Sequence, residues 1–258
     1  MAGIMAIWKF SCFFFWSILL IPPQMLVMLF SRGKAAFILP TIWQRLICRA
    51  FALEVEVTGI PVQDARTIYV GNHISYLDIP VIAGILPASF VAKAEVASWP
   101  VFGFLAKLQQ TAFINRSRKA VAHEKTALSA LLAKGKSLII FPEGTSSDGR
   151  TVLPFRSSLF GLALDDPIRP TIQTFTLELV SVNGHPVTSQ EDRDLYAWHG
   201  DMTLMPHFWS FAKSHGAKVR LHFHPPLQVQ QVNDRKELAS LCHKQVASIL
   251  EKRAPCAA

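Results

Sequence analysis

The sequence is poor in charged residues, which make up 17% of its 258 positions. An average soluble domain has about 25%. Half of the residues are hydrophobic, and the sequence shows no internal repeat and no linker rich in Gly or Ser. This composition excludes a disordered, acidic or low-complexity chain. The length predicts one large domain or two small ones, and either can bury a proper core.

Cysteine is scarce as well. Cys12, Cys48, Cys242 and Cys256 lie far apart, and none forms a Cys-x-x-Cys pair. Disulfide-rich scaffolds and structural zinc ribbons need denser cysteine patterns, so this spacing argues against both.

Signatures of three other protein classes are missing. No Gly-x-Ser-x-Gly elbow occurs, which argues against a serine hydrolase. His222 and His224 would share one face of a strand, but no acidic or histidine partner stands at a recognisable ligand spacing. We therefore predict no metal site. A nucleic-acid binder would show a basic stripe with stacking aromatics, whereas here the basic residues cluster with apolar segments.

The charge that is present is mostly positive. The chain has 26 Lys and Arg against 18 Asp and Glu, a formal net charge of +8. A positive balance favours an anionic partner, and the hydrophobic excess points to a membrane surface rather than a nucleic acid.

A long uncharged run lies near the N-terminus. After Lys9, 22 residues without charge, 10–31, precede Arg32. As a helix, this run would be about 33 Å long, enough to cross a hydrocarbon core of about 30 Å. Pro22 and Pro23 stand in its middle, so we expect a kink or a break there. Two half-length helices dipping into one leaflet fit as well as one kinked span. A secretory signal peptide and a buried core helix are the other interpretations.

Up to residue 49, basic residues such as Lys34 and Arg45 then alternate with aliphatic and aromatic residues such as Trp43. This mixture is typical of an interfacial helix that faces the cytoplasm. We interpret residues 1–50 as a membrane-anchoring helical segment whose topology in the bilayer stays open, and residues 51–258 as a separate domain.

Strands and helices alternate in the rest of the chain. Residues 53–57 alternate as a half-buried strand does, residues 67–70 and 137–141 read as buried strands, and residues 171–182 and 218–224 are later candidates. Residues 119–134 read as a helix that Gly135 ends, and residues 234–252 form a closing helix. The fold class is therefore α/β, with a mixed, largely parallel sheet flanked by helices behind the hydrophobic N-terminal segment.

The first group of residues with chemical potential follows the strand at 67–70. His73 and Asp78 are five positions apart. On a regular helix this spacing gives about 140° of rotation, so the two can meet only if His73 lies in the loop and Asp78 lies one turn into the following helix. A carboxylate that holds Nδ1–H of an imidazole leaves Nε2 as a general base. The alternative is a capping Asp beside a loop His.

A second group follows the strand at 137–141. Gly144 allows a tight turn, and Thr145 and Ser146 offer hydroxyl and N–H groups for an oxyanion or phosphate. Glu143 would repel an anion unless it orients a cation such as Lys93 or Arg116. Three cations in residues 116–119 could clamp a phosphate, although by themselves they fit a solvated helix start better.

In this order, four segments resemble the glycerolipid acyltransferase family typified by 1-acylglycerol-3-phosphate acyltransferases. That family has an Asn-His-x4-Asp block, a block ending in Arg, a Phe-Pro-Glu-Gly-Thr block and a strand with Pro. The corresponding segments here are residues 72–78, 113–116, 141–145 and 168–171. Residues 91–103 are also similar to the family, and the resemblance spans about residues 50–185.

The resemblance implies roles for individual residues. His73 takes the proton from the acceptor hydroxyl, and Asp78 orients it. Backbone donors near the His73 loop hold the oxyanion. The residues implied in substrate binding are Lys93, Arg116, Glu143, Gly144 and Thr145. No cofactor is implied, because the acyl group arrives as a thioester of coenzyme A or of acyl carrier protein.

The sequence also departs from the family pattern. Ser146 stands where many members that use lysophosphatidic acid have Arg. Residues 145–155, and residues 198–202 with Pro206 and His207, resemble a bacterial subgroup that includes lyso-ornithine lipid acyltransferases. We expect an O-acyltransferase of lysolipids at the bacterial inner membrane, with its active site facing the cytoplasm. The expected acceptor is 1-acyl-sn-glycerol-3-phosphate, that is, lysophosphatidic acid. Lyso-ornithine lipid is the alternative acceptor. A non-catalytic membrane-surface adaptor is a further alternative.

Overall fold

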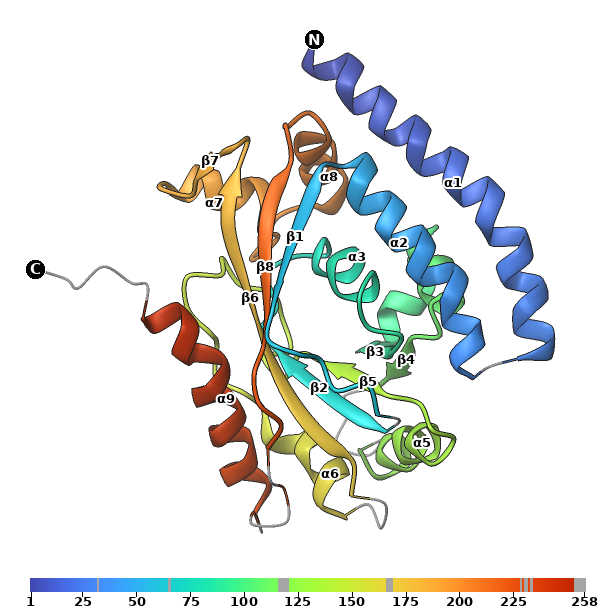
Figure 1. Ribbon diagram of the computed structural model, residues 1–258, viewed down its shortest axis with the longest axis vertical. Helices are drawn as coiled ribbons and strands as arrows, with labels where there is room; N and C mark the ends of the chain where they lie inside the picture. The colour runs from blue at the N-terminus through green and yellow to red at the C-terminus, as the bar shows by residue number, and fades with distance from the viewer. Residues whose placement is uncertain are drawn as a thin grey trace, which may run out of the picture.

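The computed structural model describes residues 1–31, 33–64, 66–115, 121–165, 169–227, 229, 232 and 234–252 (Figure 1). Within these residues, the strands form a single eight-stranded sheet in the order β1-β8-β6-β2-β5-β3-β4, with β7 paired to β6. The strands are β1 Leu53–Thr58, β2 Thr67–Gly71, β3 Ser89–Lys93, β4 Ala112–Ile114, β5 Leu138–Ile140, β6 Thr171–Val182, β7 His185–Pro186 and β8 Ala217–Phe223. All pairs are parallel except those of β6 with β7 and with β8. The predicted mixed, largely parallel α/β sheet is confirmed.

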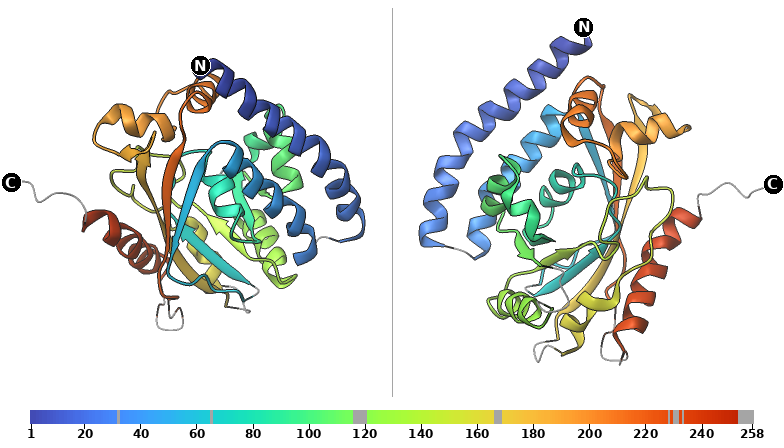
Figure 2. Two further views of the ribbon diagram at one scale, coloured as in Figure 1. Left: turned by 45° about the horizontal axis from the view of Figure 1, so that its top comes forward. Right: turned by 180° about the vertical axis from the view of Figure 1, so that it is seen from behind.

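Helices cover both faces of this sheet. They are α1 Ala2–Phe30, α2 Ile38–Ala50, α3 Asp78–Ala83, α4 Phe102–Leu108, α5 Val121–Ala133, α6 Gly161–Asp165, α7 Gln190–Tyr196, α8 Leu204–Ala212 and α9 Arg235–Glu251. Short 3-10 turns are η1 Lys34–Phe37, η2 Ala94–Ser98 and η3 Ser157–Phe160. Helices α2 and α3 lie on one face and α9 on the other, while α1 lies outermost along α2 (Figures 1 and 2).

Most helices and strands that a clear sequence pattern predicted are present at the predicted positions. The five predicted strands correspond to β1, β2, β5, β6 and β8 with each end within one residue. The closing helix is α9, capped by the Asp234 side chain. The helix expected at 119–134 is α5, whose described part begins at Val121, and Gly135 follows it with φ of +78°. The strands β3 and β4 and the short helices were not predicted, because such short segments show no complete period.

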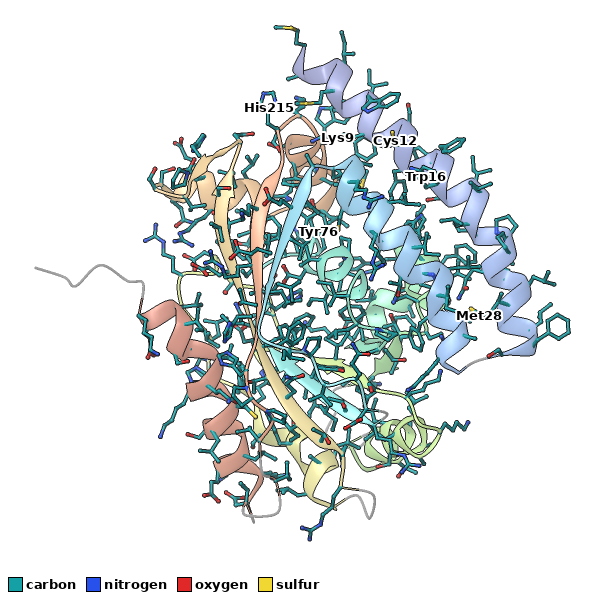
Figure 3. All side chains as sticks on the ribbon, viewed as in Figure 1. Lys9, Cys12, Trp16, Met28, Tyr76 and His215 are labelled. Carbon is teal, nitrogen blue, oxygen red and sulfur yellow. The ribbon has the colours of Figure 1, made fainter. Side chains whose placement is uncertain are left out.

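Helix α1 has three polar side chains on its buried side, those of Lys9, Ser17 and Gln24. Its buried residues are Ala6, Lys9, Phe13, Ser17 and Gln24. Lys9 Nζ donates to the carbonyls of Phe51 and Ser214, at 3.3 and 2.8 Å (Figure 3). The outward side carries large exposed hydrophobic residues, including Ile4, Ile7, Trp8, Phe14, Phe15, Ile18, Leu19, Met25, Leu26, Leu29 and Phe30. An apolar outer face is the arrangement expected for a helix solvated by lipid.

The helix does not break at its two prolines, so of the two arrangements that fitted the sequence equally, two half-length helices are not present. Pro22 and Pro23 lie inside the single helix α1. Each proline removes one backbone hydrogen bond, but both halves are fixed to the same protein surface. Before the prolines, Ser17 accepts a bond from the indole of Trp43. After them, Gln24 donates to the carbonyls of Ala36 and Leu108. By length and composition, α1 could cross a membrane.

Candidate active site

The carboxyl end of β2 determines where the first group of residues lies. Gly71 faces the ring of Phe175 on β6, and a Cβ at this position would approach that ring to 2.1 Å. The side chain of Asn72 then exchanges two hydrogen bonds with the backbone of Leu177, at 2.9 and 2.7 Å. The chain therefore leaves the sheet in a fixed direction, which positions His73.

His73 and Asp78 meet as their spacing allowed. His73 lies in the loop after β2, and its Nδ1 is 2.7 Å from Oδ2 of Asp78. The helix α3 begins at Asp78 itself, rather than one turn before it as expected. The same carboxylate oxygen accepts the backbone N–H groups of Ile74 and Ser75, at 2.7 and 3.0 Å. Asp78 thus folds the loop back on itself and also orients the imidazole.

The carboxylate of Asp78 is fully buried, and it has a fourth donor. Tyr196, at the end of α7, donates its hydroxyl to Oδ1 of Asp78 at 3.0 Å. Burial, and next the charge of Asp78, raise the pKa of Tyr196 well above its ordinary value, so this hydroxyl stays protonated. Hydrogen bonds from these four donors offset the cost of burying the carboxyl group.

The imidazole of His73 lies flat on an aromatic ring. Its centroid is 4.2 Å from that of Phe141, and the two planes differ by 10°. The side chain of His73 remains 22% exposed, so a substrate can reach the ring. Because Nδ1 faces Asp78, Nε2 is the nitrogen available to an incoming hydroxyl.

Glu143 holds the two loops of the site together. Its Oε1 accepts the N–H of His73 at 2.7 Å, and its Oε2 accepts the N–H of Leu153 at 2.9 Å. Burial raises the pKa of Glu143 to about 7, although these backbone donors oppose the shift. Glu143 was predicted to bind substrate by orienting a cation, and the structure gives it backbone partners in this position.

The turn after Glu143 packs on the His73 loop. Gly144 adopts φ of +77°. The N–H of Ser147 donates to the carbonyl of His73 at 2.9 Å. Ser146 is buried, and its hydroxyl donates to the carbonyl of Trp198. Thr145, one residue earlier, is exposed. The turn therefore forms one wall of the site.

The structure describes one of the two basic residues expected at the site. Lys93 is exposed at the end of β3, next to β4 in the sheet. Arg116 lies outside the described residues. Backbone donors of the His73 loop were expected to hold an oxyanion, but the N–H groups of His73, Ile74 and Ser75 already have carboxylate acceptors.

An apolar cavity of about 200 Å³ extends from this loop toward the N-terminal helices. Tyr76 and Leu77 line it near His73, and Phe13 of α1 and Trp43 of α2 line its other side. Phe90, also in the lining, stacks on Phe141 with centroids 6.3 Å apart. The cavity thus extends from the loop after His73 to α1 and α2.

The sequence analysis did not assign any residue of the second half of the domain to the site. Tyr196 and Trp198 lie within the site through the bonds of Tyr196 to Asp78 and of the Trp198 N–H to the carbonyl of Ile74, at 3.0 Å. The signal for them was the unusual Trp-His-Gly-Asp stretch at 198–201, which sequence analysis noted only as a resemblance.

His222 and His224 each have a threonine partner. Their side chains pair with the hydroxyls of Thr58 and Thr176, each at 2.8 Å. In the described part of the chain, no group of three His, Cys, Asp or Glu residues has the geometry to hold a metal ion. Burial, and next the neighbouring His222, lower the pKa of His224 to about 4, so it is neutral at physiological pH.

Comparison with known proteins gives four findings. The family model described as Acyltransferase matches residues 54–177. The lyso-ornithine lipid O-acyltransferase of Brucella abortus is 34% identical over 242 residues, covering 91% of this chain and 90% of that protein. The 1-acyl-sn-glycerol-3-phosphate acyltransferase of Neisseria gonorrhoeae is 41% identical over 95 residues, covering 36% of this chain and 37% of that protein. The crystal structure of the 1-acyl-sn-glycerophosphate acyltransferase PlsC from Thermotoga maritima shares the fold, with a TM-score of 0.64 at 20% identity over 98% of this chain and 97% of that one.

Proposed function

The chain belongs to the acyltransferase family, and we propose that it transfers a fatty acyl group from a thioester to the free hydroxyl of a lysolipid. The observation that carries this proposal is the buried carboxylate of Asp78, which binds Nδ1 of a partly exposed His73. This pair can deprotonate an alcohol without needing a nucleophilic side chain.

The reaction follows from this geometry. Nε2 of His73 takes the proton of the acceptor hydroxyl as its oxygen attacks the thioester carbonyl. Asp78 stabilises the imidazolium that forms, because Nδ1–H already points at its carboxylate. The tetrahedral intermediate then expels the thiolate, which receives the proton from the imidazolium. The products are the ester and a free thiol, and no acyl group is bound to the protein.

Among acceptors, we place lyso-ornithine lipid before 1-acyl-sn-glycerol-3-phosphate. The similarity to the Brucella protein extends over nearly the whole chain, whereas that to the Neisseria protein covers about a third of it. Lysophosphatidic acid is the second candidate, supported by the higher identity within the shorter region.

The acyl donor in this proposal is a thioester of coenzyme A or of acyl carrier protein. The apolar cavity beside Tyr76 is the place for the fatty chain, since a hydrocarbon chain leaves water at a gain of about 0.8 kcal/mol per buried methylene. Its opposite end reaches α1 and α2, so a chain could enter from the lipid side.

Membrane association follows from the apolar outer face of α1 and from the family. We propose that the protein lies at the bacterial inner membrane with its active site toward the cytoplasm, where acyl thioesters are made. The polar contacts of Lys9 and Gln24 hold α1 against the domain, so α1 presents one face to lipid while remaining part of the folded unit.

The experiment that tests this function is acyl transfer by membranes that contain the protein. Labelled palmitoyl-CoA and palmitoyl-acyl carrier protein are offered with lyso-ornithine lipid and, in parallel, with lysophosphatidic acid. Ester formed from either acceptor supports the proposal. The relative amounts of ester rank the acceptors and the donors. No ester with any combination, from folded protein, would favour the adaptor alternative.

A further inference from the structure

A cluster of opposite charges lies on the turn that follows the buried Ser146 and Ser147. Nε of Arg150 is 3.5 Å from Oδ2 of Asp148, and the Arg150 N–H donates to Oδ1 at 3.0 Å. Their side chains are 54% and 29% exposed. These groups therefore pair with each other weakly and remain accessible to a ligand.

A third charged residue, Arg193 on α7, belongs to the same cluster. It is half-buried, and burial is the main reason that its pKa is lowered. The next influences on it are Arg150, which lowers the pKa, and Asp148, which raises it. Arg193 therefore lies within electrostatic reach of both residues. The cluster contains two guanidinium groups and one carboxylate.

The cluster lies beside the catalytic loop. Asp148 directly follows Ser147, whose N–H is bonded to the carbonyl of His73. Gly149 packs on Ile74, because a Cβ at this glycine would lie 3.1 Å from that side chain. On the other side, Arg193 is three residues before Tyr196, which is bonded to Asp78. Residues next to Asp148 and Arg150, and a residue close to Arg193, thus contact the loop that carries His73.

We propose that Asp148, Arg150 and Arg193 form a site for a zwitterionic acceptor headgroup, namely an N-acylated diamino acid. The two guanidinium groups bind its carboxylate, and Asp148 binds its side-chain ammonium. This inference rests on the proposed function, and it identifies the acceptor class by charge. Guanidinium groups suit a carboxylate because they offer paired donors in one plane.

A phosphate headgroup would fit this cluster less well. It carries no positive group for Asp148, so the carboxylate would repel it. Ser146 gives no compensation, because its hydroxyl is buried and engaged with the Trp198 carbonyl. An N-acylated ornithine, in contrast, keeps one carboxylate and one ammonium group, which matches the cluster in sign.

The test is equilibrium binding of lyso-ornithine lipid and of lysophosphatidic acid to the full chain in detergent. Asp148→Asn should weaken binding of lyso-ornithine lipid about 10-fold and leave or improve that of lysophosphatidic acid. Arg193→Gln should weaken both about 10-fold, because it removes a group that attracts either anion. Arg193→Lys, which keeps the charge but not the paired donors, should fall between wild type and Gln.

Matched controls are Arg235→Gln and Glu251→Gln, exposed positions on α9 across the sheet. Both should bind as wild type. The proposal is overturned if Asp148→Asn affects the two lipids equally, or if wild type binds neither. Acyl transfer is measured separately: a wild type that binds lyso-ornithine lipid with the expected variant pattern but forms no ester would contradict the proposed function alone.

Discussion

Tyr196 donates its hydroxyl to Oδ1 of Asp78 at 3.0 Å, across a separation of 118 positions in the sequence. The other carboxylate oxygen of Asp78 binds His73. The end of α7 and the end of β2 therefore meet on one buried side chain, and the second half of the domain completes the support of the base.

Tyr196→Phe should remove one donor from Asp78 and leave its three other bonds in place. A buried acceptor that loses a partner costs about 1–3 kcal/mol. We expect a lower free energy of unfolding by about that amount, and a fall in kcat larger than any change in KM, because the orientation of His73 depends on Asp78. Urea unfolding in detergent and steady-state kinetics measure the two. Tyr69→Phe, whose hydroxyl donates to the Val62 carbonyl away from the site, is the control.

His73→Ala should lower acyl transfer by about 100-fold to 10,000-fold, the usual contribution of a general base. Folding and membrane binding should persist, because the side chain is partly exposed and its removal leaves the backbone bonds of the loop intact. Membrane flotation and circular dichroism check this. His185→Ala, an exposed residue on β7, should keep full activity. Near-wild-type transfer by the His73 variant would refute its role.

Glu143 should make stability depend on pH. Its pKa in the folded protein is about 7 against an ordinary value of 4.5, so between these pH values the native state binds more protons than the unfolded state. The contribution of this group to stability is full below about pH 4.5 and is lost as pH rises through about 7. The difference corresponds to about 3 kcal/mol. In Glu143→Gln this component disappears, although the loss of one acceptor adds a constant cost.

The measurement for Glu143→Gln is the free energy of unfolding at pH 4.5, 6 and 8. The free energy of unfolding of the variant should increase relative to that of the wild type as pH rises. Glu251→Gln, at an exposed position, provides the matched substitution and should follow the wild-type curve. Parallel curves for the Glu143 variant and wild type would contradict the assignment.

The two faces of α1 should respond differently to substitution. Lys9→Met removes the donor of the Phe51 and Ser214 carbonyls, and we expect a loss of about 1–3 kcal/mol in stability. Trp8→Ala, at the adjacent outward position, should leave stability unchanged and weaken binding to lipid vesicles. Thermal unfolding in detergent and vesicle flotation separate the two effects. Equal effects of both variants on flotation and on unfolding would show that the faces are not distinct.

Filling the apolar cavity should shorten the acyl chain that the enzyme accepts. Ala92 lines the cavity, so Ala92→Phe reduces the available volume. We expect the ratio of kcat/KM for palmitoyl to that for decanoyl thioesters to fall at least about 10-fold, because each excluded methylene forfeits about 0.8 kcal/mol. Ala133→Phe, exposed at the end of α5, is the control. An unchanged chain-length profile would place the chain elsewhere.

Local patterns in the sequence were sufficient for several elements. The alternation at 53–57 and the apolar runs at 67–70 and 137–141 correspond to β1, β2 and β5. The His73 to Asp78 spacing could be productive in only one arrangement, a loop His before a helical Asp, and that arrangement is present. These features depend on residues close in sequence, so period and spacing suffice to predict them.

The sequence by itself therefore determined the fold class, the pairing of His73 with Asp78 and the apolar character of the N-terminus. The tertiary structure decided the features that depend on contacts between residues far apart in the sequence. Helix α1 continues through Pro22 and Pro23 because contacts on either side fix it to one surface. Glu143 accepts the backbone N–H groups of His73 and Leu153, and Tyr196 donates to Asp78, because the chain brings distant segments together around these buried carboxyl groups. A buried polar group takes whichever donors the packed fold supplies, and sequence spacing does not encode which segments those are.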